Sequence, residues 1–184
     1  KLEKREIQIL ALSTSESSPG NFSLVLEDLI DKKRFVIIIG TFEAQAIAIY
    51  LERMELPRPL THDLFKTTIT QLGATLKEVV IHNIVDEIFQ AWLVLTDFEN
   101  KEKKVDARAS DALALAIRFD CPVFIYEPLL HKAAISEEFE KFSFLRGSVS
   151  EYTLEELQSL LNDLLAKEDY ESASKIRDLI QRRK

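Results

Sequence analysis

The stretch VIIIGTFEAQAIAI, residues 36–49, decides the fold because it predicts a buried strand that turns directly into a helix. The apolar run ends at Gly40, and the Thr41 hydroxyl is placed to cap the first free N–H groups of the helix. Glu43 follows in the first turn, where the helix dipole favours a carboxylate. Small alanines behind Glu43 allow the helix to lie close to a sheet. The stretch therefore predicts a strand-turn-helix unit with an acid at the start of its helix.

A similar unit follows in VDARASDALALAI, residues 105–117. Aligning Glu43 with Asp111 also aligns Ala44 with Ala112 and places further alanines in register. Two interpretations are open. One is an internal duplication of the strand-turn-helix unit, and the other is a chance match between alanine-rich helices.

The remaining chain predicts an α+β domain with a mixed or antiparallel sheet, followed by a helical tail. Strands are expected over residues 5–12, 22–29, 34–39, 75–84, 88–97, 103–108 and 123–126, with helices from Thr41, Thr61 and Ser110. The second helix presents Leu64, Phe65, Thr68, Ile69 and Leu72 on one face and ends at Gly73. The expected organisation is a domain over residues 1–135, a linker over 136–150 and a helical hairpin over 151–184.

The tail carries one apolar stripe, with leucines at positions 154, 157, 160, 161, 164 and 165. A second helix is expected to turn Tyr170, Ala173, Ile176 and Ile180 inward. About 34 residues are too few for an independent core. The hairpin is therefore expected to pack on the main domain, on a copy of itself or on a partner.

Composition limits the possible functions. The formal net charge of −7 argues against a broad surface for nucleic acid, because phosphate binding relies on clustered lysine and arginine. Any nucleic-acid role then needs a local basic patch or a bridging metal ion. The single cysteine, Cys121, excludes an intrachain disulfide and fits a reducing compartment, so we expect a cytoplasmic protein. No apolar run approaches the roughly 18 residues that span a bilayer, so no membrane contact is expected.

Eight polar residues are expected at helix starts, strand ends or beside them, and these are the candidates for chemistry: Glu43, Arg58, His62, Asp63, Asp106, Arg108, Ser110 and Asp111. The four acids could hold Mg²⁺ or Mn²⁺, since such ions take a few carboxylates and fill their other positions with water and substrate phosphate. His62 could move a proton, and arginines could hold the phosphate. The alternative is that each acid only caps a helix or pairs with an arginine.

The motifs IGTFEAQAIA (39–48), PRPLTHDL (57–64) and VDARASDALALA (105–116) resemble the signature blocks of the bifunctional nuclease domain family of bacteria and plants. The resemblance implies an α+β fold, a homodimer or higher homo-oligomer, and nuclease activity on DNA and RNA. It implies catalytic roles for Glu43, His62, Asp63, Asp106 and Asp111, and substrate binding by Arg58, Arg108 and Ser110. Ala109 stands where the family commonly has proline.

The tail segment EDYESASKIRDLI (168–180) is similar to the UVR motif, a helical hairpin used for protein–protein contact. This resemblance implies a protein partner bound through the hairpin, with Leu161, Tyr170, Ala173, Ile176, Arg177 and Asp178 as the partner-binding residues.

Two functions from different classes follow. The first is a metal-assisted nuclease that is targeted by its tail. The second is a non-catalytic regulatory or adaptor protein whose main domain binds a small molecule or a protein. The acidic net charge favours the second function, and the family resemblance favours the first.

Overall fold

The computed structural model of the chain describes residues 2–15, 18–86, 88–134 and 154–166, together with residues 173, 174, 176, 177, 180 and 181. The chain divides into two units, Lys1–Ala134 and Ile135–Lys184, and each is described by itself. The expected linker over residues 136–150 lies outside the described residues.

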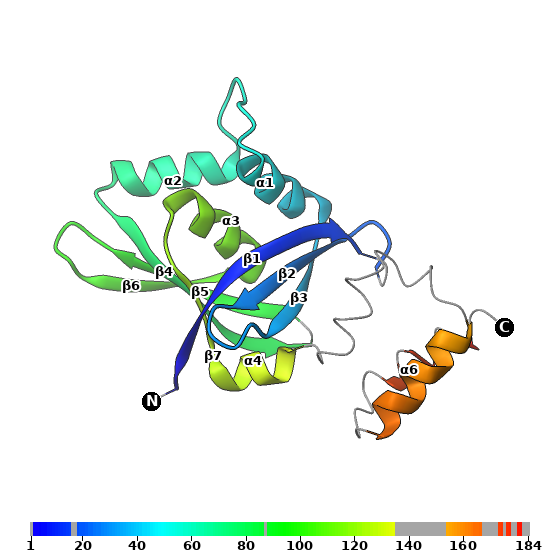
Figure 1. The fold of residues 1–184 in the computed structure, drawn as a ribbon. Helices are drawn as coiled ribbons and strands as arrows, with labels where there is room; N and C mark the ends of the chain where they lie inside the picture. The colour runs from blue at the N-terminus through cyan, green and yellow to red at the C-terminus, as the bar shows by residue number, and fades with distance from the viewer. Residues whose placement is uncertain are drawn as a thin grey trace. The chain divides into compact units, whose positions relative to one another are not determined.

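Within the described part of the first unit, seven strands form one mixed sheet in the order β3-β2-β1-β7-β4-β5-β6 (Figure 1). All neighbouring strands are antiparallel except β4 and β7, which are parallel. The strands are β1 (Lys4–Thr14), β2 (Phe22–Asp28), β3 (Arg34–Ile39), β4 (Thr75–Val85), β5 (Ile88–Thr96), β6 (Glu102–Arg108) and β7 (Val123–Tyr126). The predicted α+β class with a mixed sheet is confirmed.

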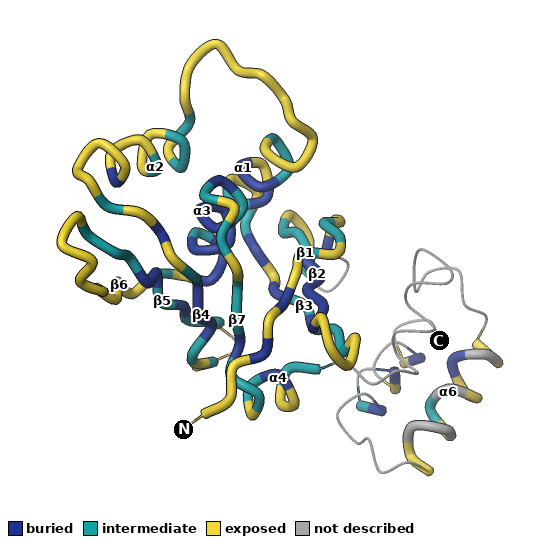
Figure 2. The backbone as a smooth tube through the Cα atoms, turned by 60° about the vertical axis from the view of Figure 1, so that its left-hand side comes forward, coloured by how far each residue is buried: buried dark blue, intermediate teal, exposed yellow. Residues whose placement is uncertain are grey.

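Three helices lie together on one side of this sheet: α1 (Thr41–Leu51), α2 (Thr61–Gln71) and α3 (Ala109–Phe119) (Figure 1). Helix α3 is largely buried, because its small and apolar side chains pack between α1, α2 and the sheet (Figure 2). A fourth helix, α4 (Glu127–Ala133), follows β7 and was not expected from the sequence. Its fully buried Leu130 joins the main core cluster.

Helix α2 is much more exposed than its sequence pattern predicts. Ile69 is its buried residue, whereas Leu64, Phe65 and Leu72 are 58%, 47% and 74% exposed (Figure 2). Most of the apolar face predicted for α2 is therefore exposed, because α2 packs mainly on α3 rather than on the sheet.

The start of α1 also differs from the sequence prediction. Gly40, not Thr41, is the N-cap residue, and no side chain caps the helix there. The Thr41 hydroxyl instead donates a hydrogen bond to the Gly20 carbonyl at 3.0 Å. Thr41 therefore ties the helix start to the loop between β1 and β2.

The two strand-turn-helix units lie at opposite edges of the sheet. Strand β3 leads into α1 at one edge, and β6 leads into α3 at the other. The two helices pack against each other over the sheet. The internal duplication stays a prediction, because this arrangement alone does not separate it from a chance match.

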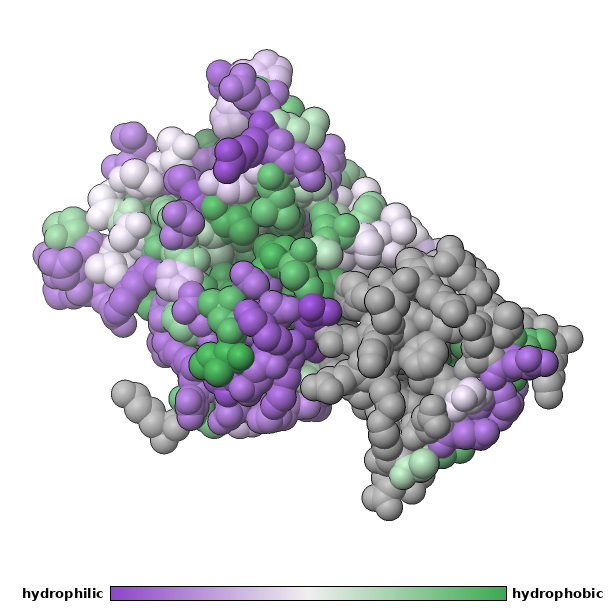
Figure 3. Space-filling model, viewed as in Figure 1, coloured by the Kyte–Doolittle hydropathy of each residue, from purple (hydrophilic) through white to green (hydrophobic). Residues whose placement is uncertain are grey.

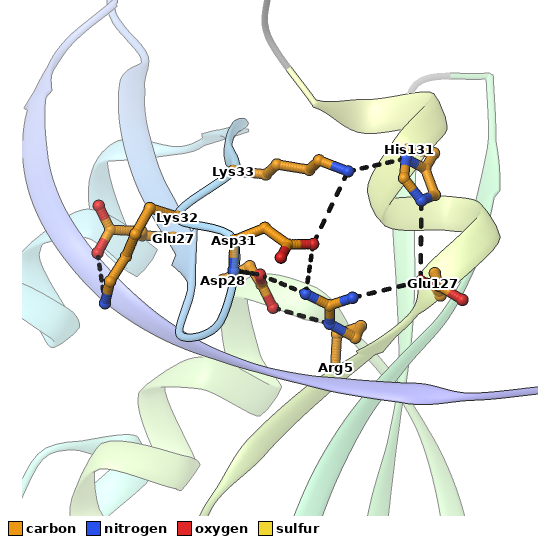
Figure 4. Close-up of polar contacts among 8 residues, drawn as sticks. All are labelled: Arg5, Glu27, Asp28, Asp31, Lys32, Lys33, Glu127 and His131. Carbon is orange, nitrogen blue, oxygen red and sulfur yellow. Dashed lines mark hydrogen bonds and ion pairs between the residues drawn. The ribbon is translucent and has the colours of Figure 1, made fainter. Parts of the chain in front are cut away.

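A buried arginine connects β1 with the β2–β3 turn and α4 (Figure 4). Arg5 is 7% exposed and binds Asp28 through two nitrogens, at 3.2 Å and 2.8 Å. It also donates to Asp31 at 2.7 Å and to Glu127 at 3.2 Å. The hydrogen bonds that Arg5 donates to Asp28 and Asp31 raise its pKa, so the guanidinium stays charged.

In the second unit, the described helix is α6 (Leu154–Ala166). Leu157, Ala173, Ile176 and Ile180 are buried, whereas Leu154 and Leu165 are 44% and 46% exposed. Tyr170 and Asp178 lie outside the described residues, and so does most of the second helix of the expected hairpin. Among the described helices of the whole chain, none is long and apolar enough to cross a membrane.

We expect Arg5→Met to lower the free energy of unfolding clearly, because it leaves the fully buried Asp28 carboxylate without its cation. Denaturation in urea, followed by circular dichroism, measures the loss. The matched control is Lys4→Met, which removes the neighbouring and more exposed ion pair with Glu78. Equal losses for the two variants would show that the buried arginine has no special role.

Candidate functional site

Four side chains from four elements form one connected group of polar contacts at the end of β6. Arg108 Nη2 lies 2.8 Å from Glu43 Oε1 of α1, and Arg108 Nε lies 2.7 Å from Asp111 Oδ2 of α3. Asp111 Oδ1 lies 3.3 Å from His62 Nε2 of α2. We call Glu43, His62, Arg108 and Asp111 the arginine cluster. All four were predicted site residues, and the structure brings them together from distant parts of the sequence.

Local sequence explains how Glu43 reaches this position. It is the third residue of α1, and its carboxylate folds back over Gly40. A Cβ atom on residue 40 would lie 2.6 Å from Glu43 Oε2. Gly40 has a φ of −73°, so its backbone conformation does not require glycine, but a side chain here would displace the Glu43 carboxylate.

The Arg108 side chain is 63% exposed although both of its acidic partners are more buried. Glu43 and Asp111 side chains are 17% and 33% exposed. The hydrogen bond to Asp111 raises the pKa of Arg108, with a smaller contribution from Glu43. The positively charged Arg108 guanidinium is therefore exposed to solvent, and its two less exposed carboxylate partners fix its position.

Asp63, the neighbour of His62, turns away from the arginine cluster. Asp63 Oδ1 accepts a hydrogen bond from Arg118 Nε at 2.6 Å, and Asp63 Oδ2 accepts one from the Leu60 N–H at 3.0 Å. Burial alone would raise the pKa of Asp63, but these two hydrogen bonds together hold it below its usual value. Asp63 is thus an ionised acid that fixes the start of α2.

Arg118 is a site residue that sequence reasoning missed. It is 2% exposed and lies near the end of α3. Besides Asp63, it donates to the Ala114 carbonyl of α3 at 2.8 Å and to the Ala46 carbonyl of α1 at 3.0 Å. One guanidinium therefore binds all three helices that carry or support the cluster. The available signal was an arginine in an otherwise apolar helix.

Asp106 does not join the arginine cluster. It is paired with Trp92 in the β5–β6 register, and its side chain is 82% exposed. Ala91 and Leu93 on either side of Trp92 face the main core, so Trp92 and Asp106 lie on the other face of the sheet. There Asp106 Oδ1 lies 3.7 Å from His82 Nε2, and the His82 ring stacks on Trp92. The expectation that Asp106 holds a metal ion together with the other acids is wrong, because Asp106 lies beside His82 on the Trp92 face of the sheet.

The remaining predicted residues take separate positions. Ser110 is buried at the start of α3. Arg58 is exposed in the segment between α1 and α2. It lines a pocket of about 880 Å³ that also includes Tyr50, Asp63 and Arg118.

The four acids predicted as metal ligands do not come together. Glu43 and Asp111 share Arg108, Asp63 binds Arg118, and Asp106 lies on the opposite face. Among the residues that the structure describes, no group of three or more His, Cys, Asp or Glu side chains is arranged to hold a metal ion. The prediction that the four acids form one metal site is therefore wrong.

Comparison with known proteins gives independent information on both units. The family model described as "Bifunctional nuclease domain" matches residues 24–138, and the "UvrB/uvrC motif" model matches residues 151–183. The chain is also similar to proteins from two strains of Mycobacterium tuberculosis, each described as an "Uncharacterized protein". Each is 34% identical over 168 residues, which cover 91% of this chain and 98% of the relative.

We expect Arg118→Met to cost about 2–4 kcal/mol of unfolding free energy, because it removes charged hydrogen bonds and leaves Asp63 without its cation. Methionine keeps most of the buried aliphatic volume, so the loss reports mainly on the guanidinium. Chemical denaturation of the full chain measures it.

The matched control for this variant is Arg53→Met, at an exposed arginine between α1 and α2. Its effect should stay within about 0.5 kcal/mol. A similar small effect for Arg118→Met would contradict the view that Arg118 holds the three helices together.

Proposed function

Because the chain belongs to the bifunctional nuclease domain family, we propose that it hydrolyses phosphodiester bonds of DNA or RNA at the arginine cluster. The observation that carries this proposal is the geometry of Arg108. An exposed guanidinium is held between two carboxylates, and one of them also contacts a histidine. Guanidinium groups suit phosphate because their planar donors match its oxygens.

The residues of the cluster suggest a division of roles. Arg108 binds the phosphate and stabilises the negative charge that develops on it. His62, oriented by Asp111, accepts a proton from the attacking water. The water oxygen forms the new bond to phosphorus, the bond to the leaving sugar oxygen breaks, and that oxygen takes a proton from solvent. Glu43 positions Arg108 from the side opposite Asp111.

Mg²⁺ or Mn²⁺ is proposed as the cofactor, with Glu43 and Asp111 as its protein ligands. Two carboxylates are enough for Mg²⁺, which commonly completes its coordination with water and substrate phosphate. Both carboxylates also bind Arg108, and each carboxylate oxygen has a further lone pair to offer. The ion would neutralise phosphate charge, which the acidic chain otherwise repels.

A second candidate is a non-catalytic regulatory or adaptor protein that binds a small molecule or a protein. The observation that favours it is that Glu43, Asp63 and Asp111 are each paired with an arginine. Paired acids of this kind are also found in purely structural roles. Activity measurements on defined variants separate the two functions.

We expect purified protein to cleave single-stranded DNA or RNA in the presence of Mg²⁺ or Mn²⁺, and His62→Ala to slow cleavage by about 10²-fold or more. Arg108→Met should slow it by about 10²–10³-fold, because a charged donor to the phosphate is lost. Initial rates on labelled oligonucleotides, with and without chelator, provide the measurement.

The matched control is Arg34→Met, which removes an arginine paired with Glu27 on β2 and β3. Gly40→Ala adds a finer test, because the new methyl group meets the Glu43 carboxylate without removing any charge. It should reduce the rate while the fold persists. Cleavage that persists unchanged in both His62→Ala and Arg108→Met would show that the nuclease site lies elsewhere or that the activity is a contaminant.

We propose further that the C-terminal unit binds protein, either a second copy of this chain in a homodimer or another partner. The match to the UvrB/uvrC motif supports this, since the resemblance of the tail implies a contact hairpin. Of the residues predicted for contact, Ala173 and Ile176 are buried and Arg177 is exposed. The exposed leucines 154 and 165 are better candidates for the contact, because burying them would remove apolar surface from water.

If the unit pairs with a second copy, Leu154→Asp combined with Leu165→Asp should halve the molar mass of the full chain in solution. Light scattering after size-exclusion chromatography measures the mass, and circular dichroism checks that helix content is kept. The molar mass of a Leu161→Asp variant, which changes a half-buried leucine of the same helix, is measured for comparison with the double variant. A double variant with the same dimeric mass as the unchanged chain would contradict pairing through this surface.

A further inference from the structure

The pocket at the end of α1 combines cationic and apolar groups. It has a volume of about 880 Å³ and lies between the end of α1, the segment that follows it and the start of α2. Its lining includes Arg53, Arg58 and the buried Arg118, against the single acid Asp63. The lining itself carries more basic than acidic side chains, although Glu52 and Glu55 stand in the same segment of the chain. In Figure 3 the α1–α2 segment, at the top of the view, shows hydrophilic residues next to hydrophobic ones.

The apolar part of the pocket can receive a flat ring. Tyr50 is 40% exposed, and the Arg118 guanidinium lies 5.2 Å from its ring centroid. Arg118 thereby fixes the orientation of the ring, because its guanidinium is also bound to three acceptors. Met54 and Leu56 line the same pocket and are 57% and 39% exposed. Aromatic and thioether side chains of this kind provide stacking surfaces for nucleobases.

The cationic part of the pocket suits a phosphate. Arg58 lies between Pro57 and Pro59, which restrict the backbone around it. Arg53 is held in a left-handed conformation with φ of 52° just after α1. Arg53 and Arg58 are exposed, whereas Arg118 is buried and its guanidinium is bound to Asp63. Two available arginines beside a stacking surface match the two chemical parts of a nucleotide.

We propose that this pocket binds a nucleotide of a single-stranded substrate, next to the nucleotide whose phosphate is cleaved at the arginine cluster. Its phosphate lies on Arg53 and Arg58, and its base lies against Tyr50. The pocket and the arginine cluster are joined through the start of α2. Asp63 lines the pocket, and the preceding residue, His62, belongs to the cluster. This inference rests on the proposed function for the position of the scissile phosphate, but nucleotide binding in the pocket can be measured without cleavage.

Binding of a labelled single-stranded hexanucleotide in the presence of chelator tests the proposal on the full chain. Tyr50→Ala and Arg58→Ala should each weaken binding about tenfold or more, because a stacked base and a phosphate contact are lost. Arg58→Ala should also reduce the salt dependence of binding by about 0.7 in the slope of log K against log salt. Tyr50→Phe should bind like the unchanged protein, since it keeps the ring.

The matched control is Lys101→Ala, which removes one positive charge at the β5–β6 turn, away from the pocket. The inference is overturned if Tyr50→Ala and Arg58→Ala bind as the unchanged protein does, or if Lys101→Ala weakens binding equally. It is also overturned if the unchanged protein binds no hexanucleotide. A free nucleoside monophosphate that binds as tightly as the hexanucleotide would assign the pocket to a free nucleotide instead of a strand.

The experiment separates this inference from the proposed function. Binding that depends on Tyr50 and Arg58 without any cleavage under Mg²⁺ or Mn²⁺ would support the pocket and reject the nuclease activity. The opposite result is that cleavage depends on His62, while Tyr50→Ala and Arg58→Ala change neither cleavage nor binding. That result would support the nuclease activity and reject the pocket.

Discussion

The buried guanidinium of Arg118 is the interaction on which the candidate site depends. It donates to the Ala46 carbonyl of α1, to Ala114 of α3 and to the Asp63 carboxylate of α2. Desolvating a guanidinium is costly unless its donors are satisfied, so the three helices are favoured in the arrangement that supplies these acceptors. Small buried residues on both helices, such as Ala44 of α1 and Ala112 of α3, allow a close approach of the two helices. The helix starts that carry Glu43, His62 and Asp111 are thereby held together.

The charges of the cluster explain why two acids can lie close together in it. Glu43 and Asp111 can share one place because Arg108 lies between them and offsets part of their mutual repulsion. Without that cation, two partly buried carboxylates would repel each other. The same pairing leaves Arg108 exposed as the group nearest to an incoming anion. The Arg108 guanidinium can therefore donate to a phosphate although the chain as a whole is acidic.

Sequence patterns predict the local parts of this structure well and the long-range parts less well. The strand-turn-helix units around Gly40 and Arg108, and the acids at their helix starts, follow from apolar runs and turn residues. The central position of β7 and the contact of His62 with Asp111 depend on pairing between distant segments, which no local pattern encodes. The separation of Asp106 from the cluster depends on the side chains around it, since Asp106 and Arg108 are two residues apart on β6 and only Arg108 reaches Glu43 and Asp111. Arg118 was missed because one charge in an apolar helix gives no indication of its acceptors.

A structure of the chain bound to a non-hydrolysable phosphorothioate dinucleotide tests the central claim most directly. The account predicts a bridging phosphate at hydrogen-bonding distance from the Arg108 guanidinium and on the side of the cluster that His62 faces. A dinucleotide found with its bridging phosphate away from Arg108, with the Glu43–Arg108–Asp111 contacts undisturbed, would contradict it.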